Sequence, residues 1–169
     1  IMIVSMKVTI ELINACSESK HPTKQDFQHW AEAALFALAE EKSARVQKNV
    51  ELSIRLVDED ESAALNENFR QKKGPTNILS FPCSENRITE TNLLGDLAIC
   101  VPLVTKEATE QNKTLEAHWA HLTVHGVLHL HDFDHEEKQA AIKMETMEIS
   151  ILDTLGYENP YEQDIKENE

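Results

Sequence analysis

Six of the eight histidines in this chain fall in one short stretch, between residues 118 and 135. On an α-helix each residue advances about 100°, so histidines spaced three, four and four residues apart share one face, within an arc about 80° wide. The four that do so are His118, His121, His125 and His129. His125 and His129, at positions i and i+4, can both reach one metal ion, and imidazole nitrogen suits zinc. The spacing therefore predicts a zinc site on this helix.

A third ligand has to come from beyond the helix. His135 follows His129 by six residues, and Asp132 between them tolerates the turn that would bring the chain back. The resulting spacing, H-x3-H-x5-H, is that of the metzincin zinc helix. We predict that His125, His129 and His135 bind one zinc ion and leave a fourth position open, as in catalytic zinc sites. The other histidines of the stretch are expected to be surface or packing residues, although His121 could also take part in the site.

The residue after His125 is Gly126. In the zinc peptidase motif HExxH this position holds the glutamate that acts as general base, so a peptidase of that kind is disfavoured. Glycine inside a helix costs about 1 kcal/mol relative to alanine. Its presence here indicates that a ligand, a substrate or a packed element approaches the helix closely.

The charge of the chain limits how it could bind a polyanion. Its formal net charge is −14, from 30 acidic and 16 basic residues. Affinity for nucleic acid phosphates comes mainly from Lys and Arg, so binding would have to rest on a local patch. Arg70, Lys72 and Lys73 form the only compact basic cluster, and a guanidinium can bind phosphate through two parallel hydrogen bonds. A solvated loop is the alternative interpretation of this cluster.

Hydrophobic periodicity predicts the elements that position these residues. Strands are expected over residues 4–13, 50–57, 77–82 and 94–101. Helices are expected over residues 25–42, 58–70, 102–111, 114–130 and 136–155, with capping boxes at Thr23 with Asp26 and at Asp58 with Glu61. The order favours a single α+β domain over residues 1–156, in which about four strands pack against about five helices, one of them the metzincin-like metal-binding helix. Residues 157–169 are expected to form a polar, acidic tail that frays.

Cysteine usage and hydropathy favour a cytoplasmic protein without a membrane partner. Cys16, Cys83 and Cys100 are far apart and form no CxxC pair, which suits a reducing compartment. The chain has no run of 18 apolar residues, and its first residues lack the layout of a signal peptide.

The stretch HGVLHLHDFDH at 125–135 resembles the HGxLHLxGYDH signature of the YbeY family, bacterial metal-dependent endoribonucleases involved in ribosomal RNA maturation. Two further blocks are similar to those of the family, TNILSFP at 76–82 and LLGDLAIC at 93–100, and the resemblance covers about residues 50 to 160. It implies that His125, His129 and His135 are the zinc ligands and that Arg70 is the site arginine. Asp132 stands where the family has glycine, and Phe133 where it has tyrosine.

The resemblance implies a zinc-dependent, single-strand-specific endoribonuclease that acts in ribosomal RNA maturation and ribosome quality control. Arg70 would be its catalytic residue, and Arg70, Lys72 and Lys73 would bind the substrate, a ribosomal RNA precursor. Its protein partners would be ribosomal or assembly proteins. DNA is not expected as a partner. Two alternatives stay open. One is a metal-dependent hydrolase of peptides or small esters. The other is a ribosome-assembly module with a structural zinc, which would need a fourth protein ligand.

Overall fold

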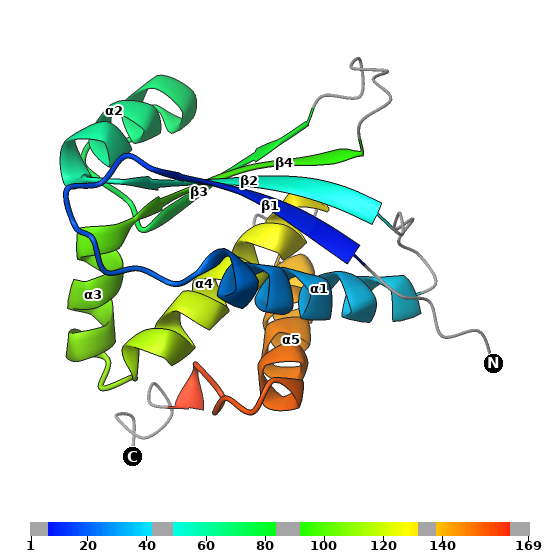
Figure 1. Cartoon of the computed structure of the whole chain (residues 1–169). Coiled ribbons are helices and arrows are strands. Elements are labelled where there is room, and N and C mark those ends of the chain that lie inside the picture. Colours follow the sequence, from blue (N-terminus) through cyan, green and yellow to red (C-terminus); the bar gives the residue numbers. More distant parts are fainter. Residues whose placement is uncertain (1–6, 42–48, 84–91, 132–137, 163–169) are drawn as a thin grey trace.

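Four strands form one mixed sheet, in the order β1-β2-β4-β3 (Figure 1). The computed structural model describes residues 7–41, 49–83, 92–131 and 138–162. Strands β1 and β2 pair in parallel, as do β2 and β4, whereas β3 runs antiparallel to β4 at the edge of the sheet. The strands are β1 (Lys7–Asn14), β2 (Asn49–Val57), β3 (Ile78–Pro82) and β4 (Leu93–Cys100).

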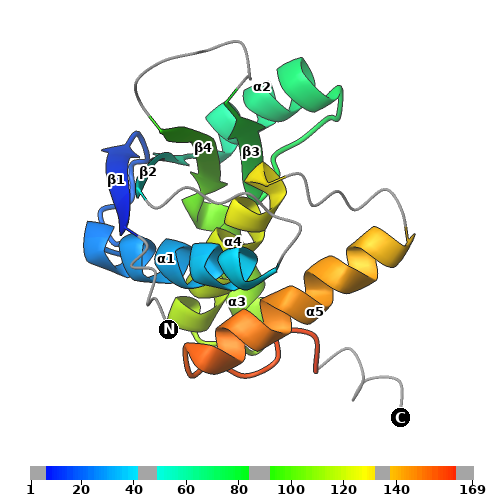
Figure 2. The same ribbon diagram turned by 90° about the vertical axis from the view of Figure 1, so that its right-hand side faces the viewer.

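The helices lie unequally on the two sides of this sheet. α1 and α4 pack beneath it and α5 lies beyond them, while α2 lies on the opposite side (Figures 1 and 2). Their bounds are α1 (Lys24–Glu40), α2 (Glu59–Arg70), α3 (Val101–Glu110), α4 (Leu115–Leu130) and α5 (Lys138–Thr154). The predicted α+β class, with about four strands and five helices, is confirmed. No helix within the described residues is long and apolar enough to cross a membrane.

Local sequence signals predict the start of α1 correctly but the cap of α2 wrongly. At α1 the capping box is present: the Thr23 hydroxyl accepts from the backbone N–H of Asp26, and the Asp26 carboxylate accepts from that of Thr23. The predicted box at α2 is wrong, because Asp58 makes no side-chain cap there. Its carboxylate accepts instead from the Cys16 thiol at 3.0 Å, while Glu61 pairs with Arg55 at 2.8 Å.

Gly126 explains how α4 approaches the sheet. A Cβ added at this position would lie 2.8 Å from Ile78 Cδ1 on β3 and 2.8 Å from Leu97 Cδ2 on β4. The close approach indicated by the glycine is therefore that of packed strands. Because α4 lies so near β3, the histidines that flank Gly126 on this helix come close to the edge of the sheet.

The segment after α5 is docked rather than frayed as far as residue 162. The Tyr157 hydroxyl accepts from Trp30 Nε1 at 3.3 Å and donates to Glu116 Oε1 at 3.1 Å. Tyr161 reaches the α5 carboxylate of Glu148. The expected fraying is wrong for residues 157–162, and the predicted domain boundary after residue 156 stays a prediction.

Candidate functional site

A cleft of about 470 Å³ opens between the end of α2, strand β3 and the C-terminal half of α4. Three residues singled out from the sequence line it together: Arg70 from α2, and His125 and His129 from α4. The residues that line it are Phe69, Arg70, Thr76, Asn77, Ile78, Leu79, Ser80, Phe81, His125 and His129. The fold thus brings the guanidinium and the two imidazoles to one opening.

The two cleft histidines are neighbours on successive turns of α4. Their ring centroids lie 4.5 Å apart with planes at 72°, and both side chains are half-buried. His135, the third predicted ligand, lies outside the described residues. Lys72 and Lys73 are exposed and are not among the residues that line the cleft.

A buried carboxylate that the sequence reasoning missed stands behind the histidines. The side chain of Glu148, on α5, is fully buried. It accepts hydrogen bonds from His125 Nδ1, from His121 Nε2 at 3.1 Å and from the Tyr161 hydroxyl. One carboxylate therefore ties two turns of α4 to α5 and to the segment that follows α5.

The electrostatics of this cluster favour an ionised Glu148 beside a neutral His121. Burial by itself would raise the pKa of the Glu148 carboxyl, but the hydrogen bonds from His121 and His125 outweigh it and hold that pKa well below its usual range. Burial lowers the pKa of the His121 imidazole, although the hydrogen bond to Glu148 acts in the opposite direction. His121 is therefore a neutral donor at neutral pH.

The bond to Glu148 also fixes which ring nitrogen His125 can offer to a metal. With Nδ1–H directed at the carboxylate, Nε2 carries the lone pair, and the ring lines the cleft. A carboxylate behind a ligating histidine is the usual arrangement in zinc sites, where it sets the tautomer and raises the basicity of the ligand. The donor types and their support fit a zinc ion on the cleft side of α4.

A second set of potential metal ligands shares one residue with the predicted set. Ligand atoms of His121, His125 and Glu148 all lie within 4.8 Å of one another, so these three form a possible metal-binding triad. His125 belongs to both sets. The triad lies on the α5 side of His125, whereas His129 lies on the cleft side, so substitution of single residues separates the two sets.

The position of Glu148 in an apolar stripe of α5 is a sequence feature that indicates a buried carboxylate. The buried residues of α5 recur at i, i+3, i+4, i+7 and i+8: Met144, Met147, Glu148, Ile151 and Leu152. A glutamate in the centre of an apolar stripe is rarely buried without a partner. The stripe indicates a buried ionic contact, but the identity of the partner depends on how α5 packs on α4.

Two other described histidines of the stretch, His118 and His131, lie outside the cleft lining. His118 is buried and its Nε2 bonds to Glu107 Oε1 at 3.0 Å, and Glu107 in turn accepts from Asn77 at the cleft wall. His131 Nδ1 lies 3.3 Å from the carbonyl oxygen of Val127, near the end of α4. Both agree with the expectation of structural histidines, whereas His121 joins the cluster around Glu148.

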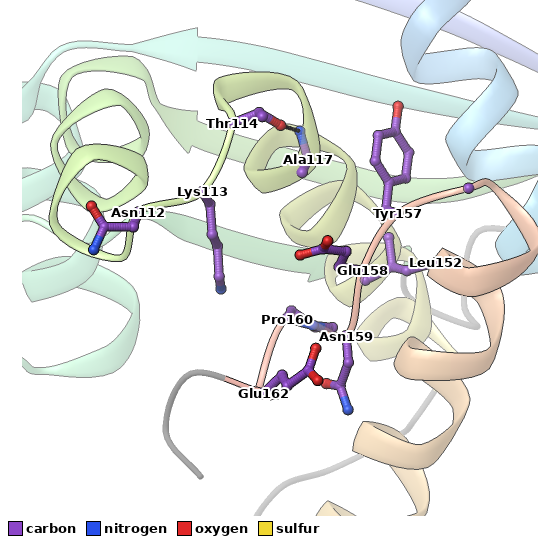
Figure 3. Close-up of a pocket in the computed structure, with 11 residues that line it drawn as sticks. Asn112, Lys113, Thr114, Ala117, Leu152, Tyr157, Glu158, Asn159, Pro160 and Glu162 are labelled. Atoms are coloured by element: carbon purple, nitrogen blue, oxygen red, sulfur yellow. Dashed lines mark hydrogen bonds between the residues drawn. The ribbon is translucent and has the colours of Figure 1, made fainter. Parts of the chain in front are cut away.

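A second cavity, of about 360 Å³, lies at the other end of α4. It opens between the connection from α3 to α4 and the segment after α5, and the side chains that line it include Lys113, Tyr157 and Glu158 (Figure 3). None of the described residues that line it is a histidine or a cysteine. Its donors do not resemble a zinc site, so the cleft beside His125 is the candidate catalytic site.

The fold brings two imidazoles, which can bind a metal ion, and a guanidinium, which can bind a phosphate ester, to one cleft. The family model described as Endoribonuclease YbeY matches residues 12–156. Endoribonuclease YbeY of Colwellia psychrerythraea is 49% identical over 156 residues, which cover 92% of this chain and 98% of that protein. The protein of the same name from Methylococcus capsulatus is 50% identical over 149 residues, covering 88% of this chain and 93% of that protein.

The chain therefore belongs to the YbeY family, and the family and enzyme class predicted from the histidine signature are confirmed. A solved structure, the solution structure of TM1509 from Thermotoga maritima, is similar with a TM-score of 0.55. It is 23% identical and the match covers 94% of this chain and 93% of that one, which supports the fold.

Proposed function

We propose that this chain is a zinc-dependent endoribonuclease specific for single-stranded RNA, which acts in the cytoplasm on ribosomal RNA precursors during ribosomal RNA maturation and ribosome quality control. The observation that carries the proposal is the cleft that Arg70, His125 and His129 line together, in a chain of an endoribonuclease family. Ribosomal or assembly proteins are its proposed partners, and DNA is not.

The proposed roles follow from the chemistry of each side chain. His125, His129 and His135 hold the zinc, which when bound acts as a Lewis acid on the phosphoryl group and makes water more acidic. Glu148 fixes His125 with its Nε2 available to the metal. The Arg70 guanidinium binds the scissile phosphate and neutralises charge that develops on its oxygens. Lys72 and Lys73, exposed just after α2, bind neighbouring phosphates of the strand.

The two alternatives fit the structure less well. Gly126 supplies no carboxylate for the general base of a zinc peptidase, and a side chain there would require Ile78 and Leu97 to shift, because a Cβ would lie 2.8 Å from an atom of each. A structural zinc site is closed by four protein ligands. Among the described residues that line the cleft, only His125 and His129 are typical zinc ligands, and none is a cysteine.

The proposed function is tested by metal removal. The purified protein should cut single-stranded RNA, lose that activity on treatment with a chelator and regain it when zinc is added back. RNA duplexes and panels of peptides and small esters are assayed in parallel. Hydrolysis of a peptide or ester with no cleavage of RNA would refute the proposal, as would full RNA cleavage by protein that retains no metal.

Replacing Glu148 by glutamine should weaken zinc binding by about 10- to 100-fold, the usual effect of losing a carboxylate that supports a ligating histidine. The neutral amide no longer fixes the His125 tautomer. Zinc affinity is measured by competition with a chromogenic chelator. Glu145→Gln is the matched control, since Glu145 is exposed on the same helix. Equal zinc affinity of both variants would show that Glu148 has no positioning role.

A further inference from the structure

The cleft carries an aromatic pair that the hydrolytic chemistry does not use. Phe69, on α2, and Phe81, on β3, meet edge to face, with centroids 5.1 Å apart and planes at 72°. Both rings line the cleft with Arg70 and the two histidines. Phe69 is 62% exposed, the highest fraction among the exposed large apolar side chains of the described residues. The two rings therefore offer an exposed aromatic surface at the cleft.

The local fold holds this ring in place next to the guanidinium. α2 ends at Arg70, and Gln71 follows in the left-handed conformation with φ 55°, so the chain turns away directly after the two residues. Phe81 supports Phe69 from the strand side. Consecutive residues thus present an aromatic ring and a phosphate-binding group to the same cleft.

We propose that Phe69, supported by Phe81, is a stacking platform for one unpaired nucleobase of the RNA strand whose phosphate is bound at Arg70. This inference rests on the proposed function. Every base has a π face, so an aromatic side chain stacks on any of them. Within a duplex both faces of each internal base are already stacked, so the platform favours an unpaired base. In a chain of net charge −14, stacking also supplies affinity that phosphate contacts cannot.

The proposal is tested by the affinity of the full-length protein for a single-stranded 2′-O-methyl RNA of about 10 nucleotides, a length typical of single-strand sites. Binding is measured by fluorescence anisotropy, and a gel checks that the strand stays intact. Phe69→Ala should bind about 5- to 150-fold more weakly, the loss found for one stacked base. Phe69→Leu, which keeps apolar volume without a ring, should lose affinity similarly, whereas Phe69→Tyr should bind like the unchanged protein.

Two controls make the result specific. Phe36→Ala removes another exposed phenylalanine, 47% exposed on α1 and absent from the cleft lining, and should leave affinity unchanged. A strand of abasic nucleotides should bind more weakly than the full strand and should not distinguish Phe69→Ala from the unchanged protein. The proposal is overturned if Phe69→Ala retains full affinity, or if it loses as much affinity for the abasic strand. Because no cleavage is measured, these outcomes are independent of whether the protein hydrolyses RNA.

Discussion

Replacing Arg70 by alanine is expected to lower the rate of RNA cleavage by about two to three orders of magnitude, the usual effect of removing one group that stabilises transition-state charge. Arg70 is exposed at the end of α2 and lines the cleft with His125 and His129. Zinc content and the unfolding temperature should therefore stay unchanged. Initial rates on a single-stranded RNA, measured beside metal analysis of the same sample, check this result.

Arg70→Lys is the informative companion variant. A lysine keeps the charge but lacks the planar pair of donors that matches two phosphate oxygens, so it should restore activity only in part. Replacing Lys72 and Lys73 together by alanine should instead weaken binding to all RNA sequences alike, because phosphate contacts carry no base information. If Arg70→Ala cleaves RNA at the unchanged rate, the arginine has no part in the reaction and the cleft is not the site of phosphate binding.

The sequence predicts this fold well where the deciding interactions are local. The cap of α1 joins two residues three positions apart, and Pro102 stands in the first turn of α3, so short-range rules are sufficient. The prediction of a cap at α2 was wrong because the partner of Asp58 is distant in the sequence. The Asp58 carboxylate binds Cys16, from a segment more than 40 positions earlier, and no local rule anticipates that partner.

The candidate site shows the same difference between local and long-range interactions. Helical periodicity places His125 and His129 on one face, since both lie on a single helix. That Arg70 joins them depends on β3 lying against α4, where Gly126 leaves room for Ile78. Glu148 and Tyr161 reach the cluster from α5 and from the segment beyond it. The carboxylate behind His125 is therefore set by tertiary packing, whereas the three predicted ligands rest on sequence spacing and stay a prediction.

Replacing His129 by alanine is expected to reduce bound zinc from about one ion per chain to almost none, and to abolish metal-dependent RNA cleavage, because a catalytic zinc site has only three protein ligands. His129 lies on the cleft side of His125, with the ring centroids 4.5 Å apart. Zinc is measured by mass spectrometry of the purified protein after gel filtration, and circular dichroism checks that the variant is folded.

The matched variant is His121→Ala, which changes another half-buried histidine of the same helix face. In the predicted site His121 is not a ligand, and its Nε2 contacts Glu148 and the Tyr161 hydroxyl, so this variant should keep its zinc, with a lower affinity. If the ion were held instead by His121, His125 and Glu148, whose ligand atoms lie within 4.8 Å of one another, the two variants would exchange behaviour. Full zinc retention by His129→Ala with loss in His121→Ala would therefore move the metal to the α5 side of His125, away from the cleft that Arg70 lines.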